Sequence, residues 1–343
     1  MTVKFTSRKR VCWLLLLLSC FSMVSAAQAE LPACVTNQPI LFVVRNQYRA
    51  DHHNTATFFP SAANEYNDGY FQAGGALKTY DPATGQVTTL LETPAGVIRD
   101  PDVHFDGDRI VFSMRTDIND SYHIYEINAD GSGLTQLTSL DDVDDMDPIY
   151  MPSGKIVFTS TREPKYIPCN RHIGANIYAM DADGANINQI SRNALFDDHP
   201  SLMPDGRILY SRWEYVDRNF GDAQGLWSCD PNGTGHAIYY GNNTRSPGGV
   251  LDGRVIPGTQ TTVCTFSSCH DRPWGAIAII DRRKGVDGQA AVVRTWPVGL
   301  ESWVTDAHNF DQFKSTPIKH EDPYPLADPE TGVGGRYFLC SRQ

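Results

Sequence analysis

The chain has few basic residues for its length of 343 residues. Its 29 Lys and Arg stand against 40 Asp and Glu, which gives a net charge of −11. No basic stripe offsets this excess of acidic residues. A surface of this kind repels the phosphate backbone of nucleic acids and anionic lipid headgroups. We therefore expect no nucleic acid among the partners of this protein.

Several signatures of catalysis and cofactor binding are absent. The sequence has no G-x-S-x-G nucleophile elbow, no phosphate-binding glycine loop and no C-x-x-C-H haem-attachment motif. The cysteines beyond residue 30 are too widely spaced in a chain of this size to indicate a disulfide framework. A serine peptidase, a nucleotide-binding loop and an ordinary c-type haem site are therefore not predicted.

Long apolar runs are also rare, and the only one is VCWLLLLLSCFSMV near the N-terminus. Lys4 and Arg8 to Arg10 precede it, and the small-x-small sequence Ala27-Gln28-Ala29 follows it. This order is typical of a secretory signal peptide, and the apolar core is too short to span a membrane. We predict a signal peptide over residues 1–29 and a periplasmic or secreted protein that starts at Glu30. Cleavage changes the net charge from −11 to about −15, because it removes four basic residues and no acidic ones.

A repeat is the strongest pattern in the sequence. Four segments share a proline followed six residues later by a glycine and then by a short β-branched run such as RIVF or KIVF. The pairs are Pro101/Gly107, Pro148/Gly154, Pro200/Gly206 and Pro247/Gly253, with prolines 47, 52 and 47 residues apart. A second element follows in step, as HIYEINADG, NIYAMDADG or GLWSCDPNG, and each predicts a strand that ends in an Asp-Gly or Asn-Gly turn.

Helical periodicity is nearly absent, and each repeat predicts four short strands joined by tight turns. A four-stranded unit of about 40–50 residues is the signature of a β-propeller blade, which must stack on its neighbours to bury both faces of its sheet. We predict an all-β propeller over residues 30–343, with about five blades and an incomplete sixth. The first unit lacks a clear first strand, and the last begins at HEDPYPL and ends within or just after its second strand.

Two resemblances follow from these motifs. PDG…IVFS with IYxMDADG resembles the TolB-type propeller repeat over residues 100–240. Longer blocks are similar to the N-terminal propeller region of the hydrazine synthase alpha subunit: RNQYRADHHNT, GGALKTYD, RWEYVDRNFGDAQGLW, FSSCHDRPWGAIAIIDRR and EDPYPL. This resemblance implies an exported propeller. The catalytic haem domains of that family follow the propeller and would start beyond Gln343, so no haem ligand is transferred to this sequence.

The stretch CTFSSCH, from Cys264 to His270, raises the question of a widened haem anchor. In register with the other repeats its first part is the second strand of a unit. Cys264 and Cys269 lie five residues apart, so on a strand they point to opposite faces, whereas haem attachment needs both thiols at one porphyrin edge. We therefore do not predict haem. We expect Cys264 to be a buried small residue, and the loop after the strand to be either a thiolate–imidazole metal site or a loop in which Asp271 pairs with His270 or Arg272.

A divalent transition metal is the sharpest hypothesis that the sequence supports. Asp51, His52 and His53 are adjacent in a loop of the first unit, and carboxylate and imidazole suit zinc, iron or manganese. His199 stands where the preceding repeats have Asp100 and Asp147. Because equivalent positions form a ring around a propeller axis, these residues could converge at one mouth of the channel. The candidate ligands are Asp51, His52, His53, His199, Cys269 and His270, and the alternative is that these side chains only stabilise loops.

Other stretches favour structural roles. The sequence PKYIPCNRH holds Cys169 and His172 in a long loop that we interpret as surface. We expect DADGAN, from Asp181, to be a strand turn and DDVDDMD, from Asp141, to be a solvated acidic loop, because neither has the length and terminal glutamate of an EF-hand loop. The aromatic stretch RWEYVDRNFGDAQGLW could contact a partner or pack over a blade edge.

Two classes of function remain open at this stage, beside a third possibility that the chain is a subunit or remnant of a haem redox complex. One is a binding or scaffold module that takes a protein partner or a small ligand at the channel mouth. The other is a metal-dependent, lyase-like propeller enzyme, in which Arg45 or Arg272 would bind a substrate carboxylate. The sequence does not decide whether the protein is an enzyme.

Overall fold

The computed structural model describes residues 32–36, 38–46, 72–167, 173–214, 224–241, 243–307 and 309–342. These residues belong to one compact unit, Pro32–Gln343. Within the described part of the chain, no helix has the length and apolar character needed to cross a bilayer.

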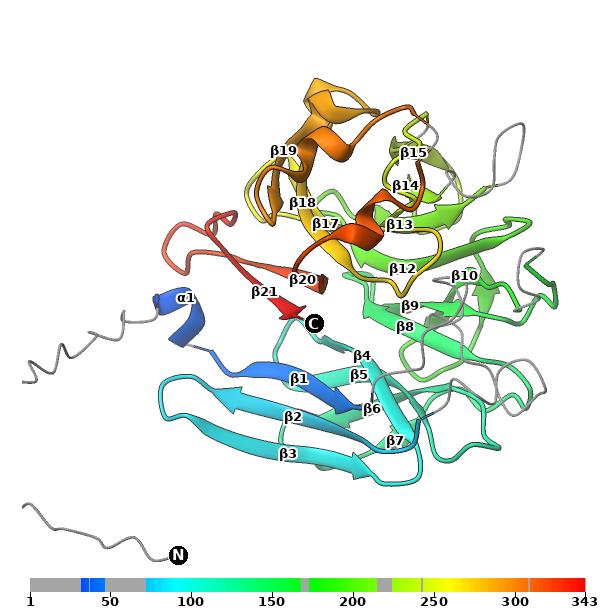
Figure 1. The fold of residues 1–343 in the computed structure, drawn as a ribbon. Coiled ribbons are helices and arrows are strands. Elements are labelled where there is room, and N and C mark those ends of the chain that lie inside the picture. The colour runs from blue at the N-terminus through cyan, green and yellow to red at the C-terminus, as the bar shows by residue number, and fades with distance from the viewer. Residues whose placement is uncertain are drawn as a thin grey trace, which may run out of the picture. The chain divides into compact units, whose positions relative to one another are not determined.

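The unit is built almost entirely from antiparallel strands (Figure 1). A four-residue helix, α1 (Ala33–Thr36), precedes a three-stranded sheet. The strands of this sheet are β1 (Ile40–Arg45), β2 (Gly75–Asp81) and β3 (Gln86–Thr93). The predicted first unit, with its first strand missing from the repeat pattern, therefore has three strands among the described residues.

Two separate four-stranded sheets follow. The first contains β4 (Val97–Val103), β5 (Arg109–Arg115), β6 (His123–Asn128) and β7 (Thr135–Gln136). The second contains β8 (Asp145–Tyr150), β9 (Lys155–Ser160), β10 (Asn176–Asp181) and β11 (Asn188–Gln189).

The remaining strands form three antiparallel groups that single residue pairs link into one sheet, Gln224 with Gly249 and Gly275 with His320. The first group has β12 (Phe196–Leu202), β13 (Ile208–Trp213), β14 (Gln224–Cys229) and β15 (Ala237–Tyr240). The second has β16 (Gly249–Val255), β17 (Thr261–Ser267), β18 (Gly275–Asp281) and β19 (Val292–Trp296). The third has β20 (His320–Leu326) and β21 (Tyr337–Arg342). Short 3₁₀ turns lie at Arg282–Lys284, Gln289–Ala291, Leu300–Trp303 and Gln312–Ser315.

The first strand of five groups carries the same irregularity. Each has a β-bulge at which the pairing register shifts, and a residue in the left-handed conformation occupies each bulge. These residues are Asp100, Asp147, His199, Asp252 and Asp322, with φ between 48° and 53°. A residue with a Cβ pays about 1–2 kcal/mol for this conformation. The bulge turns the side chain away from the regular alternation of the strand.

The fourth proline–glycine pair predicted from the sequence is wrong. Pro247 lies before β16, and the residue equivalent to Pro101 is Gly253, which follows the bulge residue Asp252. The Asp252-Gly253 pair therefore forms the bulge, while the turn into β17 lies at Gly258, with φ of 68°. Glycine replaces proline after the bulge in this group, so the spacing rule selected the wrong proline.

Hydrophobic side chains from neighbouring sheets pack against one another. Val111 and Ile124 of one sheet form a cluster with Tyr150, Ile156 and Phe158 of the next. Comparable clusters join the β8–β11 sheet to the β12–β15 group, and this group to β16–β19. The sheets are therefore buried on both faces, as the propeller prediction requires.

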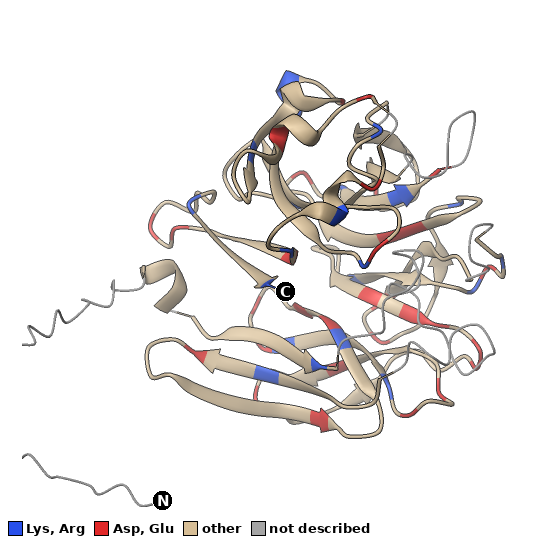
Figure 2. Cartoon of the chain, viewed as in Figure 1, with Lys and Arg blue, Asp and Glu red and all other residues tan. Residues whose placement is uncertain are grey.

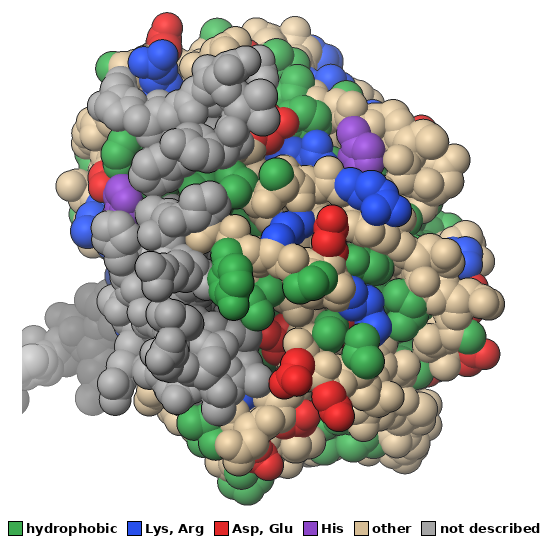
Figure 3. All heavy atoms as spheres, turned by 90° about the vertical axis from the view of Figure 1, so that its right-hand side faces the viewer, with side chains coloured by type: hydrophobic (Ala, Val, Ile, Leu, Met, Phe, Trp, Pro, Cys, Tyr) green, Lys and Arg blue, Asp and Glu red, His purple; other side chains and the backbone are tan. Residues whose placement is uncertain are grey.

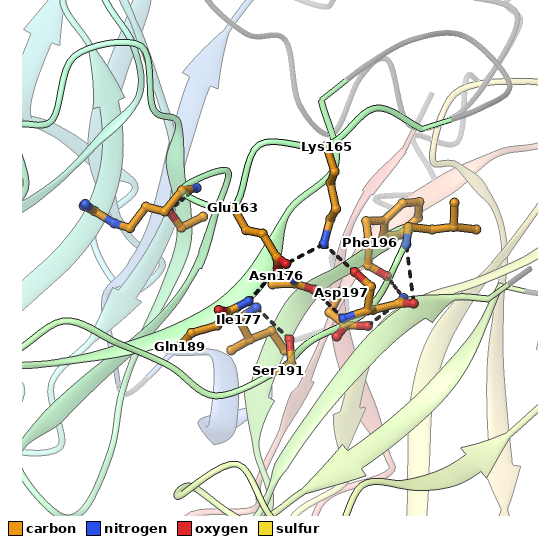
Figure 4. A network of polar contacts seen from close by, with 12 residues as sticks. Glu163, Lys165, Asn176, Ile177, Gln189, Ser191, Phe196 and Asp197 are labelled. Atoms are coloured by element: carbon orange, nitrogen blue, oxygen red, sulfur yellow. Dashed lines mark hydrogen bonds and ion pairs between the residues drawn. The ribbon is translucent and has the colours of Figure 1, made fainter.

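A polar network supplements this packing between β8–β11 and β12–β15 (Figure 4). The Asp197 carboxylate, which is fully buried, accepts two hydrogen bonds from Arg212, at 2.7 and 2.8 Å. Glu163 accepts hydrogen bonds from the amides of Asn176 and Gln189, and its carboxylate lies 3.8 Å from the ammonium of Lys165. Bidentate pairing compensates for the desolvation of the buried carboxylate.

Truncation of Phe196 tests the packing of these sheets. Phe196 is fully buried and its ring contacts Trp213 edge-on, at a centroid distance of 5.5 Å. We expect Phe196→Ala to lower the free energy of unfolding by about 3–5 kcal/mol, because it leaves a cavity. Phe105→Ala is the matched control, since Phe105 is 58% exposed, and it should change the value by less than about 0.5 kcal/mol. Urea unfolding measures the free energy of unfolding of both variants. An equal decrease in Phe196→Ala and Phe105→Ala would contradict this packing.

Candidate functional site

A cavity of about 770 Å³ lies among the first strands of the groups. Residues of β1, β4, β8, β12, β16 and β20 line it, together with parts of α1 and β21. Its volume falls within the range of small-molecule sites. Strands that are far apart in the sequence therefore contribute to one site.

The bulge residues gather at this cavity. Asp100, Asp147, His199, Asp252 and Asp322 all line it, and we call these five side chains the bulge ring. Acidic residues within β8 and β12 are visible in Figure 2. The position of His199 in the series of Asp100 and Asp147, predicted from the repeat, is confirmed by the shared bulge and the shared cavity.

Two cationic side chains lie among the carboxylates of the ring. Arg99, on β4, contacts Asp100 directly, and its Nη2 lies 3.7 Å from Oδ1 of Asp147. His199, on β12, has Nδ1 3.2 Å from Oδ2 of the buried Asp198 and Nε2 3.4 Å from Oδ1 of Asp252. Both nitrogens of the imidazole thus face carboxylates.

The burial of these groups changes their protonation. Burial, and then the neighbouring Asp100 carboxylate, raise the pKa of Asp147 to about 8. Burial also raises the pKa of Asp252 to about 6, against the opposing effect of His199. Asp198 and Asp252 raise the pKa of His199 well above its ordinary value, although burial acts in the opposite direction. At neutral pH the ring therefore holds a proton on Asp147 and an imidazolium at His199, while Asp252 is mostly ionised.

The remainder of the cavity wall combines apolar side chains with five further charged ones, Arg45, Asp102, Arg254, Arg272 and Glu321. Side chains at the start of the unit and at its end share this wall, including Leu41 and Phe42 of β1, Leu326 of β20 and Leu339 of β21. Val103, at the end of β4, also lines the cavity and is 43% exposed. The site thus combines a charged ring with a wall that has both apolar and charged side chains.

The other predicted metal ligands do not all lie at the bulge ring. Cys269 is fully buried, with its sulfur 4.0 Å from Nε2 of Gln224. Nδ1 of His270 lies 2.8 Å from Oδ2 of Asp311, and neither Cys269 nor His270 lines the cavity. Asp51, His52 and His53 lie outside the described residues. The convergence of all six side chains on one ion therefore stays a prediction.

The CTFSSCH stretch is a strand followed by a loop, as expected. Cys264 lies within β17 and is fully buried, and Cys269 follows the strand. Of the expected partners of Asp271, Arg272 contacts it through a backbone hydrogen bond. The Asp271 carboxylate also pairs with the ammonium of Lys319, and His270 pairs with Asp311 instead. Lys319 and Asp311 come from the segment before β20, which the local sequence does not bring close.

The expectation of a solvated acidic loop at DDVDDMD is wrong for its second half. Asp144, Asp145 and Asp147 are buried, while Asp141 and Asp142 are exposed. Asp144 accepts a hydrogen bond from the backbone N–H of Tyr122 at 2.9 Å. β8 begins at Asp145 and carries these acidic residues into the interior. Sequence reasoning missed them because acidic runs are usually exposed.

Sequence reasoning also missed Asp198, Asp252 and Asp322 as members or neighbours of the site. A signal for Asp322 was present, because Asp322-Pro323 repeats the Asp-Pro pair of Asp100 and Asp147. No such signal marks Asp252, which glycine follows. Cys169 and His172, as well as most of the aromatic stretch from Arg212, lie outside the described residues.

The bulge ring is not a compact metal cage. Within the described ranges, three ligand atoms come within 4.8 Å of one another at His104, Asp106 and Asp108. That group lies in the turn between β4 and β5, where both carboxylates are exposed. We expect the ring to suit a ligand with more widely spaced donors.

The protonation of the ring makes a prediction about stability. Because the pKa of Asp147 rises from 3.8 to about 8 on folding, the folded state binds its proton more tightly, and the free energy of unfolding should fall as pH rises through this range. Asp252 also lowers the free energy of unfolding as pH rises from 3.8 to about 6, and His199 does so above pH 6.5. The opposite contribution of Asp100, whose pKa is lowered, is confined to pH below 3.8.

Asp147→Asn should therefore flatten the decline of the urea midpoint between pH 6 and about pH 8. Asp106→Asn is the control, because the Asp106 side chain is 77% exposed, and it should keep the decline of the unmodified protein. An equal slope in all three proteins would refute the proton on Asp147.

On the face shown in Figure 3, acidic, basic and hydrophobic side chains lie intermixed. The part of this face that the structure describes has no broad field of a single charge. It therefore provides no support for binding a polyanion.

Comparisons with known proteins bear on the fold. No family model and no curated protein sequence matches this chain. Among solved structures, it is similar to hydrazine synthase from Kuenenia stuttgartiensis, with 19% sequence identity and a TM-score of 0.62 over 89% of this chain and 42% of that chain. This chain thus spans less than half of the length of that one.

Two TolB structures are more distant. TolB from Acinetobacter baumannii has 18% identity and a TM-score of 0.45, over 61% of this chain and 46% of that chain. A putative TolB from Agrobacterium tumefaciens has 16% identity and a TM-score of 0.46, over 66% of this chain and 78% of that chain. The resemblances to hydrazine synthase and to TolB are confirmed as resemblances of structure, and the chain is an all-β protein with a propeller-type fold.

Proposed function

We propose that this protein is an exported propeller that acts as a binding module and takes a small ligand into the cavity among its first strands. The observation that carries this proposal is the cavity of about 770 Å³, which strands from all the groups line. Its mixture of apolar walls and a few convergent polar groups is typical of ligand sites. The propeller fold supports a binding role but does not identify the ligand.

The backbone strain at the ring supports a role in binding. Five residues with a Cβ adopt the left-handed conformation at equivalent positions, and all five line the cavity. Such conformations persist where the surrounding structure imposes them, and they are common at ligand sites. A regular strand would direct these side chains differently, so the bulges determine what the cavity presents.

The metal-dependent lyase is less well supported by the described residues. A histidine must be neutral at one nitrogen to bind a metal ion. Both nitrogens of His199 face carboxylates, and these carboxylates favour the imidazolium. An ion that binds His199 would have to displace this proton.

A variant that fills the cavity tests the proposed function. Val103 lines the cavity, whereas Val87, on β3, does not line it and is 53% exposed. We expect Val103→Trp to abolish the binding of cavity ligands, which a fragment screen by ligand-observed NMR on residues 30–343 would identify. Val87→Trp, the matched control, should retain binding. If no fragment binds in a way that depends on Val103, the cavity is not a ligand site.

Export is tested separately. The basic, apolar and small-residue order of residues 1–29 supports cleavage after Ala29. We expect the protein expressed with its own N-terminus in a Gram-negative host to be found in the periplasm with a mature chain that begins at Glu30. Intact mass and N-terminal sequencing of the periplasmic fraction measure this. An uncleaved chain in the cytoplasm would contradict export.

A further inference from the structure

We propose that the bulge ring recognises an organic cation, a primary ammonium or guanidinium group attached to an apolar body, which it holds against Asp147. This inference rests on the proposed function, since it assigns a ligand class to the same cavity. It depends on three observations about the described residues, namely the charge balance of the ring, the environment of Asp147 and the spacing of the ligand atoms.

The charge balance leaves negative charge to be compensated. Asp147 of β8 faces Arg99 and Asp100 of β4 and His199 of β12. The groups that face Asp252 of β16 are His199 and Asp198 of β12, Arg254 of its own strand and Asp322 of β20. With His199 charged, the cavity and its neighbours hold five cations, namely Arg45, Arg99, Arg254, Arg272 and His199. They hold seven carboxylates, namely Asp100, Asp102, Asp147, Asp198, Asp252, Glu321 and Asp322. Full ionisation of the carboxylates therefore requires an added cation.

Asp147 is a weakly compensated carboxylate of the bulge ring. It is only 7% exposed and lines the cavity. Its one ion-pair partner within the described ranges is Arg99, at 3.7 Å, which is beyond hydrogen-bonding distance, and Arg99 also contacts Asp100. Its backbone N–H donates to Oγ of Ser113, and its carboxyl group shares a hydrogen bond with Asp100, which adds negative charge instead of compensating it. A buried carboxylate without an N–H donor favours either a proton or a ligand that brings donors.

The spacing of the ring favours an organic cation over a metal ion. No three ligand atoms of the ring come within 4.8 Å of one another among the described residues. An ammonium group instead presents three N–H donors, and a guanidinium presents five, so either can bridge carboxylates that are farther apart. The apolar wall formed by residues such as Phe42, Leu326 and Leu339 would cover the attached hydrocarbon.

The binding of such a cation should displace protons. Asp147 carries a proton at neutral pH in the free protein, because its pKa is about 8. An alkylammonium keeps its charge across this range, as a lysine side chain does with its pKa of ~10.4. Binding should therefore release protons and should tighten as pH rises from 6 to about 8, and the imidazolium of His199 acts in the same direction.

The test compares hexylamine, hexanol and hexanoate, which share an apolar chain and differ in charge. Isothermal calorimetry on the mature protein at pH 8 should show hexylamine binding at least about tenfold more tightly than either of the others. Titrations in buffers with different ionisation enthalpies should show proton release with hexylamine. Asp147→Asn should weaken hexylamine binding by about tenfold or more and reduce the proton release, while Asp106→Asn should change neither.

The outcomes separate this inference from the proposed function. If hexanol or hexanoate binds as tightly as hexylamine and the binding is lost in Val103→Trp, the cavity is a ligand site but the cation assignment is wrong. If hexylamine binds without proton release, the assignment to Asp147 is likewise overturned. Asp252→Asn provides a second variant in case Asp147→Asn does not fold, and it should also weaken hexylamine binding. The measurement of proton release on the unmodified protein tests the inference even if neither variant folds.

Discussion

Burial of both faces of each sheet is the constraint on which this structure depends. A sheet whose strands are apolar on both sides, as β5, β9 and β13 are, cannot exist alone in water. Only neighbouring sheets can cover these faces, and the clusters between successive sheets show that they do. Once the sheets stack in sequence order, their first strands come to surround one cavity. The site is thus a consequence of the packing.

The bulges convert this arrangement into a charged site. In a regular first strand, alternate side chains would point into the packed interior. The left-handed residue at each bulge instead lines the cavity, so that Asp100, Asp147 and His199 meet although 99 residues separate the first from the last. The cost is the desolvation of several carboxylates, which the protein offsets with Arg99, with His199 and with protons. Such partial compensation is more typical of a binding site than of a structural ion pair.

The hydrogen-bonded network around Asp197 gives the contrast. Its carboxylate is also fully buried, but Arg212 satisfies it with two short hydrogen bonds. No comparable pairing exists for Asp147 within the part of the chain that the structure describes. The two buried aspartates thus have different environments. Asp197 is fully paired with Arg212, whereas Asp147 lines the cavity.

The sequence by itself determined the strand pattern, the repeat and the equivalence of His199 with Asp100 and Asp147, because alternation, turn residues and Asp-Pro or His-Pro pairs are local signals. Only the tertiary structure decided that Asp252 belongs to the same ring and that Asp144 and Asp145 are buried. It also decided that His270 pairs with Asp311. Burial and pairing depend on which distant strands become neighbours, and a bulge followed by glycine has the same local pattern as a turn.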